Sequence, residues 1–324
     1  MASWQAHLIS FVLRHTFKRK LARSKDVFQA RSAMGGDAKF KTPAGIQITP
    51  AALGGIPGEW VRPESGPDAG VLLYLHGGGY FACSAASHRA YTTFFAQQGF
   101  RVYAPDYRLA PENQFPAAIT DAVAAYGALR AEVGAAKPIV IGGDSAGGGL
   151  ALATLLKLRA EGDTLPVAAV LFSPLTDFVG TGNSRATNDK RCAMFFGNAL
   201  AFTRDLYLAG ADARDPLASP LYADLKGLPP LLIHAGADET LLDDSTRLAE
   251  SARAASVSVE LTVWPVVPHV WQLFHRFVPE GRQSLTAASL FLSQAIAEVN
   301  GSTVSQGTPG LLPVDRAQKA EVVS

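Results

Sequence analysis

Short apolar runs alternate with longer amphipathic stretches through most of the chain. The runs are rich in Val, Ile, Leu and aromatic residues and are bounded by Gly, Pro, Asn and Asp, which is typical of buried strands. Helical stretches such as 115–130 and 148–160 separate the later runs. This alternation predicts an α/β fold with a mainly parallel eight-stranded sheet covered by helices on both faces. The expected strands are 45–49, 58–62, 71–75, 101–103, 138–141, 168–172, 231–234 and 257–264.

Three segments depart from this pattern. Residues 1–44 begin with an apolar helical stripe that includes Trp4 and Leu8 and is followed by a basic cluster. Residues 176–213 carry Gly, Asn, Asp and aromatic residues where the next strand and helix would otherwise follow. Residues 299–324 are rich in Ser, Gly, Pro and charge, which predicts a flexible tail. A single α/β domain over 45–298, with an insertion at about 176–213, is therefore expected.

Composition narrows the class of protein. A net charge of +1 over 324 residues provides no global attraction to nucleic acid, and no apolar run reaches the length of a membrane span. The basic cluster follows the amino-terminal apolar stripe, whereas a secretory signal places its charges first. The two cysteines, Cys83 and Cys192, lack metal-site spacing and favour a reducing compartment. We expect a cytoplasmic protein without a metal, a cofactor or stable membrane insertion.

Gly143-Asp144-Ser145-Ala146-Gly147 follows directly on the apolar run 138–141. A strand, a sharp turn with serine at its tip and a helix form a nucleophile elbow. Gly143 and Gly147 flank the serine because a Cβ at either position would collide with the neighbouring strand or helix. Gly-x-Ser-x-Gly alone is a weak signal in a chain with 30 glycines, so its weight depends on the rest of the site.

A second turn supports the first. The apolar run 71–75 leads into His76-Gly77-Gly78-Gly79. Glycines allow backbone N–H groups to face a substrate, and such groups stabilise the oxyanion that forms when a serine attacks an acyl carbon. A phosphate-binding turn is the alternative, but the segment is not Gly-x-Gly-x-x-Gly and no Lys-Ser/Thr pair follows it.

A serine nucleophile needs a base and a carboxylate that orients the base, in the chain order Ser, Asp or Glu, His. His269 follows the expected strand 257–264 on a loop, which makes it the expected base. Asp238 lies nearest the end of the strand 231–234 and is the first choice for the acid. Three further carboxylates on that loop remain rivals, namely Glu239, Asp243 and Asp244.

Other polar residues near these motifs are interpreted as structural. Asp144 is expected to hold nearby loops by hydrogen bonding, because adjacent residues of the elbow point in different directions. Arg108 and Glu112 are expected to form an ion pair that fixes their loop. His234, inside a strand, and His275, after a phenylalanine on an expected helix, are interpreted as core residues.

Together these segments resemble the bacterial hormone-sensitive-lipase family of α/β-hydrolases, the family IV esterases. The resemblance covers about residues 45–295. It is carried by 76–79, by Tyr107-Arg108-Leu109-Ala110-Pro111-Glu112, by 143–148, by Asp215-Pro216-Leu217-Ala218-Ser219-Pro220-Leu221 and by Pro268-His269-Val270. One departure is that Asp238-Glu239-Thr240-Leu241 stands where the family often has Asp-Pro-Leu.

The resemblance implies an α/β-hydrolase fold with Ser145 as nucleophile, Asp238 as acid and His269 as base. It implies an oxyanion hole formed by the N–H groups of Gly77, Gly78 and Ala146. It also implies that the amino-terminal helices and the 176–213 segment form a cap. Binding of a basic amphipathic helix to a membrane interface is the alternative role for the amino terminus. The expected lining of the acyl pocket is Phe81, Phe195, Phe196, Phe202 and Trp271.

The expected function is that of a cofactor-independent serine carboxylesterase acting on short- to medium-chain acyl esters. Two alternatives remain open at this point. One is a non-catalytic small-molecule receptor on the same scaffold, against which the presence of His269 argues. The other is an amidase or peptidase, which would use the same triad. The resemblance further suggests a homodimer formed through a terminal sheet strand.

Overall fold

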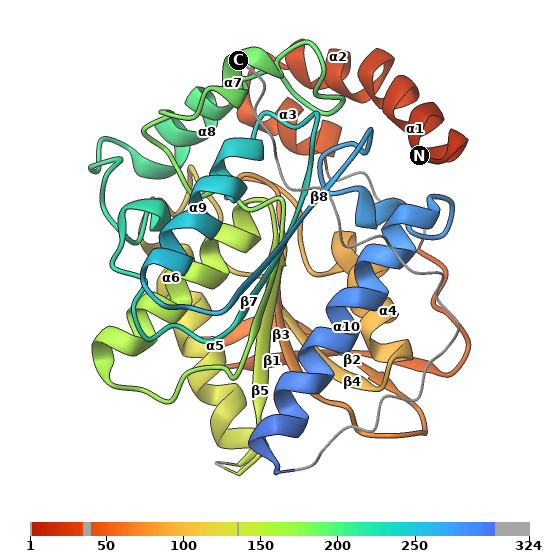
Figure 1. Cartoon of the computed structure of the whole chain (residues 1–324), viewed down its shortest axis with the longest axis vertical. Coiled ribbons are helices and arrows are strands. Elements are labelled where there is room, and N and C mark those ends of the chain that lie inside the picture. Colours follow the sequence, from red (N-terminus) through yellow and green to blue (C-terminus); the bar gives the residue numbers. More distant parts are fainter. Residues whose placement is uncertain (1, 35–39, 135, 302–324) are drawn as a thin grey trace.

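The computed structural model describes residues 2–34, 40–134 and 136–301, and its centre is one eight-stranded sheet (Figure 1). The strand order is β1-β2-β4-β3-β5-β6-β7-β8, in which the β1–β2 and β2–β4 pairs are antiparallel and all others parallel. This confirms the expected α/β fold and the expected strands. The strands are β1 (Ile46–Leu53), β2 (Ile56–Pro63), β3 (Gly70–Leu75), β4 (Phe100–Pro105), β5 (Ile139–Asp144), β6 (Ala169–Phe172), β7 (Leu231–Gly236) and β8 (Val259–Trp264).

Helices cover both faces of the sheet (Figure 1). On one face lie α4 (Arg89–Gln97) and α10 (Pro279–Val299), and on the other lie α5 (Ala117–Val133), α6 (Ala146–Glu161) and α9 (Leu242–Ala254). Successive side chains of a strand point to opposite faces, so both layers are filled by the same strands. In β3, Leu73 packs with the α5 and α6 layer, and Leu72 packs with the α4 and α10 layer.

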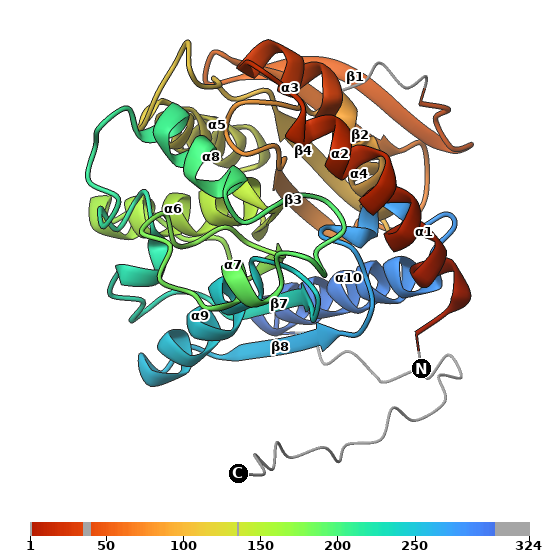
Figure 2. The same ribbon diagram turned by 90° about the horizontal axis from the view of Figure 1, so that it is seen from above.

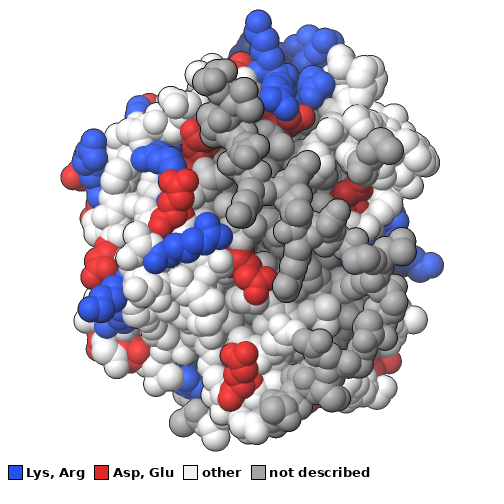
Figure 3. Space-filling view, viewed as in Figure 1, with Lys and Arg blue, Asp and Glu red and all other residues white. Residues whose placement is uncertain are grey.

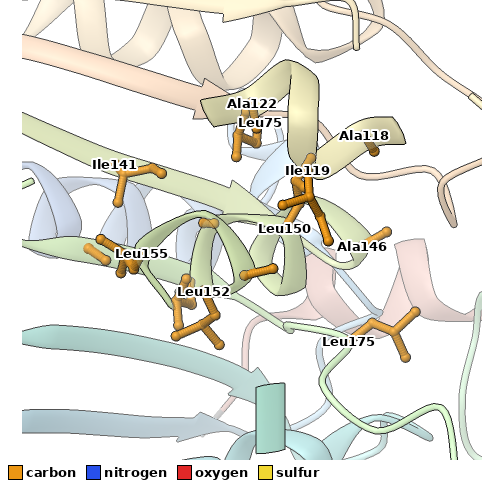
Figure 4. Packing of buried hydrophobic residues seen from close by; sticks show 14 of the residues in the cluster. Leu75, Ala118, Ile119, Ala122, Ile141, Ala146, Leu150, Leu152, Leu155 and Leu175 are labelled. Carbon is orange, nitrogen blue, oxygen red and sulfur yellow. The ribbon is translucent and has the colours of Figure 1, made fainter. Parts of the chain in front are cut away.

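The core around α6 determines where the elbow lies (Figure 4). Leu150, Leu152 and Leu155 of α6 are fully buried, as are Ile141 of β5 and Ile119 of α5. A helix that is apolar on nearly every side must be enclosed, and α6 is enclosed by the sheet, by α5 and by the loop after β6. The first turn of α6 is therefore held firmly at the carboxyl edge of the parallel strands.

Two segments cover that edge. Figure 2, from above, shows α1 (Trp4–His15), α2 (Phe17–Ala22) and α3 (Val27–Met34) running across the molecule. The inserted segment contributes α7 (Ser184–Thr187) and α8 (Ala199–Leu208). Three short 3-10 helices complete the described elements: η1 (Ala86–His88), η2 (Pro220–Tyr222) and η3 (Trp271–Phe274). Residues 35–39 of the expected cap and 302–324 of the expected tail lie outside the described residues.

Polar contacts attach this cover to the body. Arg31 of α3 donates hydrogen bonds to the carbonyl oxygens of Phe81 (2.5 Å) and Ala110 (2.6 Å) and forms a two-pronged ion pair with Glu112. The expected pair of Arg108 with Glu112 is therefore wrong. Arg108 instead binds Asp121 of α5, with 2.7 Å between Nη2 and Oδ1. The loop from Arg108 to Glu112 is not helical, so side chains four apart do not face each other.

Candidate active site

The nucleophile elbow is present at Ser145. Its backbone has φ 53° and ψ −122°, a strained conformation between the end of β5 and the start of α6. A Cβ on Gly143 would lie 2.3 Å from the carbonyl oxygen of Gly147, and a Cβ on Gly147 would lie 2.1 Å from that of Leu75. Both positions therefore require glycine, as expected from the sequence. The turn directs Ser145 into a cavity at the carboxyl edge of the sheet.

His269 lies against the serine. Its Nε2 is 2.9 Å from Ser145 Oγ, and its Nδ1 is 2.7 Å from Oε2 of Glu239. The carboxylate holds the proton on Nδ1, which leaves Nε2 as the acceptor for the serine hydroxyl proton. Side-chain exposure is 4% for His269 and 1% for Glu239, so little water competes for either contact.

The expectation that Asp238 supports His269 is wrong, because Glu239 occupies that position. The chain turns after β7, and Asp238 points outward to form an ion pair with Arg191 while keeping 19% side-chain exposure. Oε1 of Glu239 accepts hydrogen bonds from the Gly236 N–H (2.6 Å) and the Ser173 hydroxyl (2.7 Å). The longer side chain of glutamate thus reaches back to the histidine from one residue further along the loop.

The two other rival carboxylates organise the inserted segment instead. Asp243 accepts a hydrogen bond from the N–H of Ser184 at 3.0 Å. Asp244 accepts from the N–H groups of Thr176 (2.8 Å) and Asp177 (2.9 Å), and burial raises its pKa to about 6. Neither reaches His269.

The glycine turn after β3 requires a second correction. The N–H of Gly77 points to Oδ1 of Asp144 at 3.1 Å and is not available to a substrate. Gly78 and Gly79 line the cavity, and within the described residues their N–H groups have no hydrogen-bond partner. The N–H of Ala146, at the first position of α6, has none there either. The available donors are therefore Gly78, Gly79 and Ala146, in place of the expected Gly77, Gly78 and Ala146.

Asp144 holds the two turns together, as expected. Besides the Gly77 N–H, its carboxylate accepts a hydrogen bond from the Tyr74 hydroxyl (2.9 Å) and lies 3.2 Å from Nε2 of His88. Burial acts to raise the pKa of Asp144, but the neighbouring His88 and the hydrogen bonds from His88 and Tyr74 together lower it. His76 is buried beneath the turn, and burial lowers its pKa to about 3. Its ring is therefore neutral at physiological pH.

The cavity above Ser145 has a volume of about 560 Å³ and lies between the body and the two covering segments. Phe81, Phe195, Phe196 and Phe202 line it, as expected, and the Phe195 ring meets that of His269 edge-on at 4.9 Å. Trp271 does not line it. Helix η3 turns this fully buried side chain into a separate apolar cluster formed with Ala6, Val267 and Val278.

Several lining residues were not expected. Leu13, Phe17, Lys18 and Leu21 of α1 and α2 face the cavity, as does Met34 of α3. The helical spacing of Leu13, Phe17 and Leu21 was a usable signal, because these apolar residues recur every four residues. The sequence alone did not indicate which face of these helices would turn inward.

His234 and His275 take no part in the site around Ser145. His234 and His275 are buried, as expected, and burial lowers the pKa of each to about 4. Within residues 2–34, 40–134 and 136–301, no cluster of three or more His, Cys, Asp or Glu side chains could hold a metal ion. Over the same ranges, no helix is long and apolar enough to span a membrane.

Comparison with known proteins identifies the fold and the family. A family model described as the alpha/beta hydrolase fold matches residues 72–273. The acetyl-hydrolase of Streptomyces hygroscopicus is 43% identical over 257 residues, which cover 79% of this chain and 85% of that protein. An esterase of Acinetobacter venetianus is 36% identical over 248 residues, covering 76% and 82%. The crystal structure of a hormone-sensitive lipase from a metagenome library matches with a TM-score of 0.86 and 39% identity, covering 91% of this chain and 100% of that chain.

With the sheet, the elbow and the buried histidine in place, the chain belongs to the α/β-hydrolase fold family. Within that family its relatives are esterases and acetyl-hydrolases. The protein is a carboxylic ester hydrolase of the hormone-sensitive-lipase family.

Proposed function

We propose that the protein is a serine carboxylesterase whose triad is Ser145, His269 and Glu239. The observation that carries this proposal is the continuous chain of contacts from Ser145 Oγ through His269 to Glu239, with distances of 2.9 and 2.7 Å. Nε2 of His269 accepts the serine proton as Oγ attacks the ester carbonyl carbon. The protonated histidine then donates that proton to the leaving alkoxide, and an acyl-enzyme remains.

Deacylation uses the same groups with water as the nucleophile. His269 removes a proton from the water as it attacks the acyl carbon, and then returns a proton to Ser145 Oγ as the carboxylic acid leaves. Glu239 keeps the imidazole oriented and stabilises its charged form in both steps. The N–H groups of Gly78, Gly79 and Ala146 are the proposed oxyanion hole, since all three are without a partner in the described residues.

The proposed substrates are short- to medium-chain acyl esters of about four to eight acyl carbons, an interval taken from the family resemblance. The cavity is finite and mostly apolar, so each added methylene contributes about 0.8 kcal/mol only while space remains. Beyond that point an extra carbon meets the wall, and overpacking opposes binding. A profile that still rises through palmitate esters would contradict the closed-pocket proposal.

Substitution of the nucleophile tests the chemistry. Ser145→Ala should reduce hydrolysis of p-nitrophenyl butyrate by about 10⁴- to 10⁶-fold while the melting temperature stays close to that of the wild type. A matched p-nitroanilide distinguishes an esterase from an amidase, and binding without turnover by the wild type would indicate a receptor. Wild-type turnover in a folded Ser145→Ala protein would exclude Ser145 as the nucleophile.

A further inference from the structure

Helix α1 is apolar on two opposite faces. Ala6 and Leu13 are buried against the body, together with Ser10. The opposite face presents its apolar side chains to solvent with exposures of 66% for Trp4, 42% for Leu8, 58% for Phe11 and 40% for Val12. A helix that only covered a pocket would carry polar residues on its outer face. We call the exposed set Trp4, Leu8, Phe11 and Val12 the outer apolar face.

A basic cluster continues from this face. Arg19, Lys20, Arg23 and Lys25 are exposed, and within the described part of the chain none of them forms an ion pair. Figure 3 shows Lys and Arg gathered at the end of the molecule where Figure 1 places α1 and α2. A groove of about 590 Å³ runs beside the first three of these side chains. The rest of its lining is polar and consists of His15, Thr16, Ser24, Gln29 and Ser32.

Charge is distributed unevenly over the whole chain. Residues 2–34 contain seven Lys and Arg but one acidic residue, Asp26, while the net charge of the chain is +1. The rest of the protein is therefore net negative. An anionic surface would attract the amino-terminal helices more strongly than the net negative remainder of the chain, so that α1 and α2 meet it first.

We propose that the outer apolar face and the basic cluster form a peripheral docking surface for an anionic phospholipid bilayer. Exposed Trp, Phe and Leu on one helical face, with Lys and Arg beside them, is the arrangement by which a helix lies in the membrane interface. The apolar side chains enter the boundary between headgroups and acyl chains. Arg19, Lys20 and Arg23 bind lipid phosphates.

A second copy of the chain fits this surface less well. A two-fold interface built on the outer apolar face would bring two basic clusters close together, with no acidic residues of α1 or α2 to offset them.

Docking on a bilayer also has a consequence for the site, because the inner side chains of the same helices line the catalytic cavity. The cavity would then lie close to a phase in which apolar esters dissolve.

Co-sedimentation with vesicles tests the proposal and is independent of hydrolysis. The full chain should bind phosphatidylcholine vesicles containing about 30 mol % phosphatidylglycerol much more tightly than pure phosphatidylcholine, with an affinity that falls as salt is raised. Replacing Arg19, Lys20 and Arg23 together with Gln should weaken binding by about a hundredfold, since each basic residue near the surface contributes about a factor of five. Leu8→Ser with Phe11→Ser should also weaken binding.

The matched control removes equal charge from the opposite end of the molecule. Lys157 near the end of α6, Lys226 before β7 and Arg253 near the end of α9 lie toward the amino edge of the parallel strands. Their triple Gln variant should bind vesicles like the wild type, and both triple variants should hydrolyse a soluble ester at the wild-type rate. Equal binding to neutral and anionic vesicles, or equal loss in both triple variants, would overturn the proposal. So would a concentration-dependent dimer that the Leu8 and Phe11 substitutions abolish.

Discussion

Two neighbouring hydrogen-bond donors, from Gly236 and Ser173, hold the carboxylate of Glu239 in place. Gly236 closes β7 and Ser173 follows β6, and each donates a hydrogen bond to Oε1. A Cβ on Gly236 would lie 2.8 Å from that same oxygen. The glycine thus provides both a donor and the space for the glutamate side chain. Oε2 is left free to orient His269.

Exchange of the two adjacent carboxylates for amides should separate their roles. Glu239→Gln keeps the shape but removes the charge that stabilises protonated His269, so kcat should fall by about 10³- to 10⁴-fold. Asp238→Asn removes a partly exposed ion pair and should change kcat by no more than a few-fold. Steady-state hydrolysis of p-nitrophenyl butyrate at matched thermal stability measures both. A larger loss in Asp238→Asn would contradict the assignment of Glu239.

The sequence predicted Ser145 and His269 but not the acid beside them. Ser145 was predicted because Gly143 and Gly147 flank it in a tight turn after a strand. His269 was predicted because it lies on the loop after an expected strand. The choice between Asp238 and Glu239 depends on how the chain turns within two residues of β7, and no periodicity reports that turn. Ser173 and Gly236 were the residues that could have indicated a buried carboxylate. Both are small, both lie at the ends of adjacent strands, and each donates a hydrogen bond to Glu239.

At the scale of elements, Lys18 joins the two segments that cover the cavity. Its Nζ donates to the carbonyl oxygens of Asp189 (2.6 Å) and Cys192 (2.8 Å) and lies 3.9 Å from the centre of the Phe196 ring. Burial lowers the pKa of this amine. A side chain from α2 therefore holds the loop between α7 and α8 in place. The shape of the cavity depends on this link between the amino-terminal helices and the inserted segment.

Replacing this amine should loosen α1 and α2. Lys18→Met retains length and apolar contact but leaves two carbonyl oxygens without their donor, at a cost of about 1–3 kcal/mol. Amide exchange in residues 4–22 should accelerate about fivefold or more. Lys20→Met is the control, because Lys20 is exposed and has no ion pair among the described residues. Equal exchange rates in the two variants would show that Lys18 does not hold the cover in place.

Removal of the whole amino-terminal cover extends this test to substrate choice. A chain that begins near residue 40 lacks the part of the cavity wall formed by Leu13, Phe17 and Leu21. We expect lower activity on butyrate esters and a changed preference for acyl length, measured by kcat/KM over a series of p-nitrophenyl esters. Unchanged activity and selectivity would contradict a cap role for these helices.

The sequence specified the elements of the sheet better than those of the cover. Each strand has its own apolar run, and alternation fixes which side chains face each layer. The inserted segment contains short helices and loops that are held by single polar contacts such as Asp244 with the N–H of Thr176. Contacts of this kind depend on distant residues meeting in space, which a local pattern does not encode.

For the whole molecule, buried histidines should make stability fall in acid. His76, His234 and His275 have folded-state pKa values of about 3, about 4 and about 4, below their ordinary 6.5, because burial disfavours the charged ring. The unfolded chain then binds more protons between those values, so the free energy of unfolding declines as pH falls below 6.5. From pH 7 to 5 each contributes a loss of about 2 kcal/mol. Asp244, with a raised pKa of about 6, offsets about 1 kcal/mol.

Urea unfolding at pH 7, 6 and 5 measures this slope. His234→Gln retains a polar side chain near Ser284, whose hydroxyl lies 2.7 Å from His234 Nδ1. The variant should lose about one proton of pH dependence between pH 5 and 6. A slope equal to that of the wild type would show that His234 does not stay neutral in the folded state.

During biosynthesis, α1 can attach to the body only after a distant part of the chain has been made. The N–H and hydroxyl of Ser3, which caps this helix, bind Glu280 at 2.6 and 2.8 Å across 277 positions of the chain. At ~5–20 residues per second, ribosomes need about 15 to 55 s to make that partner after Ser3 has formed. Throughout this interval the inner face of α1 lacks its packing partners, since Ala6 packs in the folded chain against Val267, Trp271 and Val278, while its outer apolar face is exposed as it is in the folded chain. The helix that completes the enzyme is thus the segment that a nascent chain offers longest to a holding chaperone.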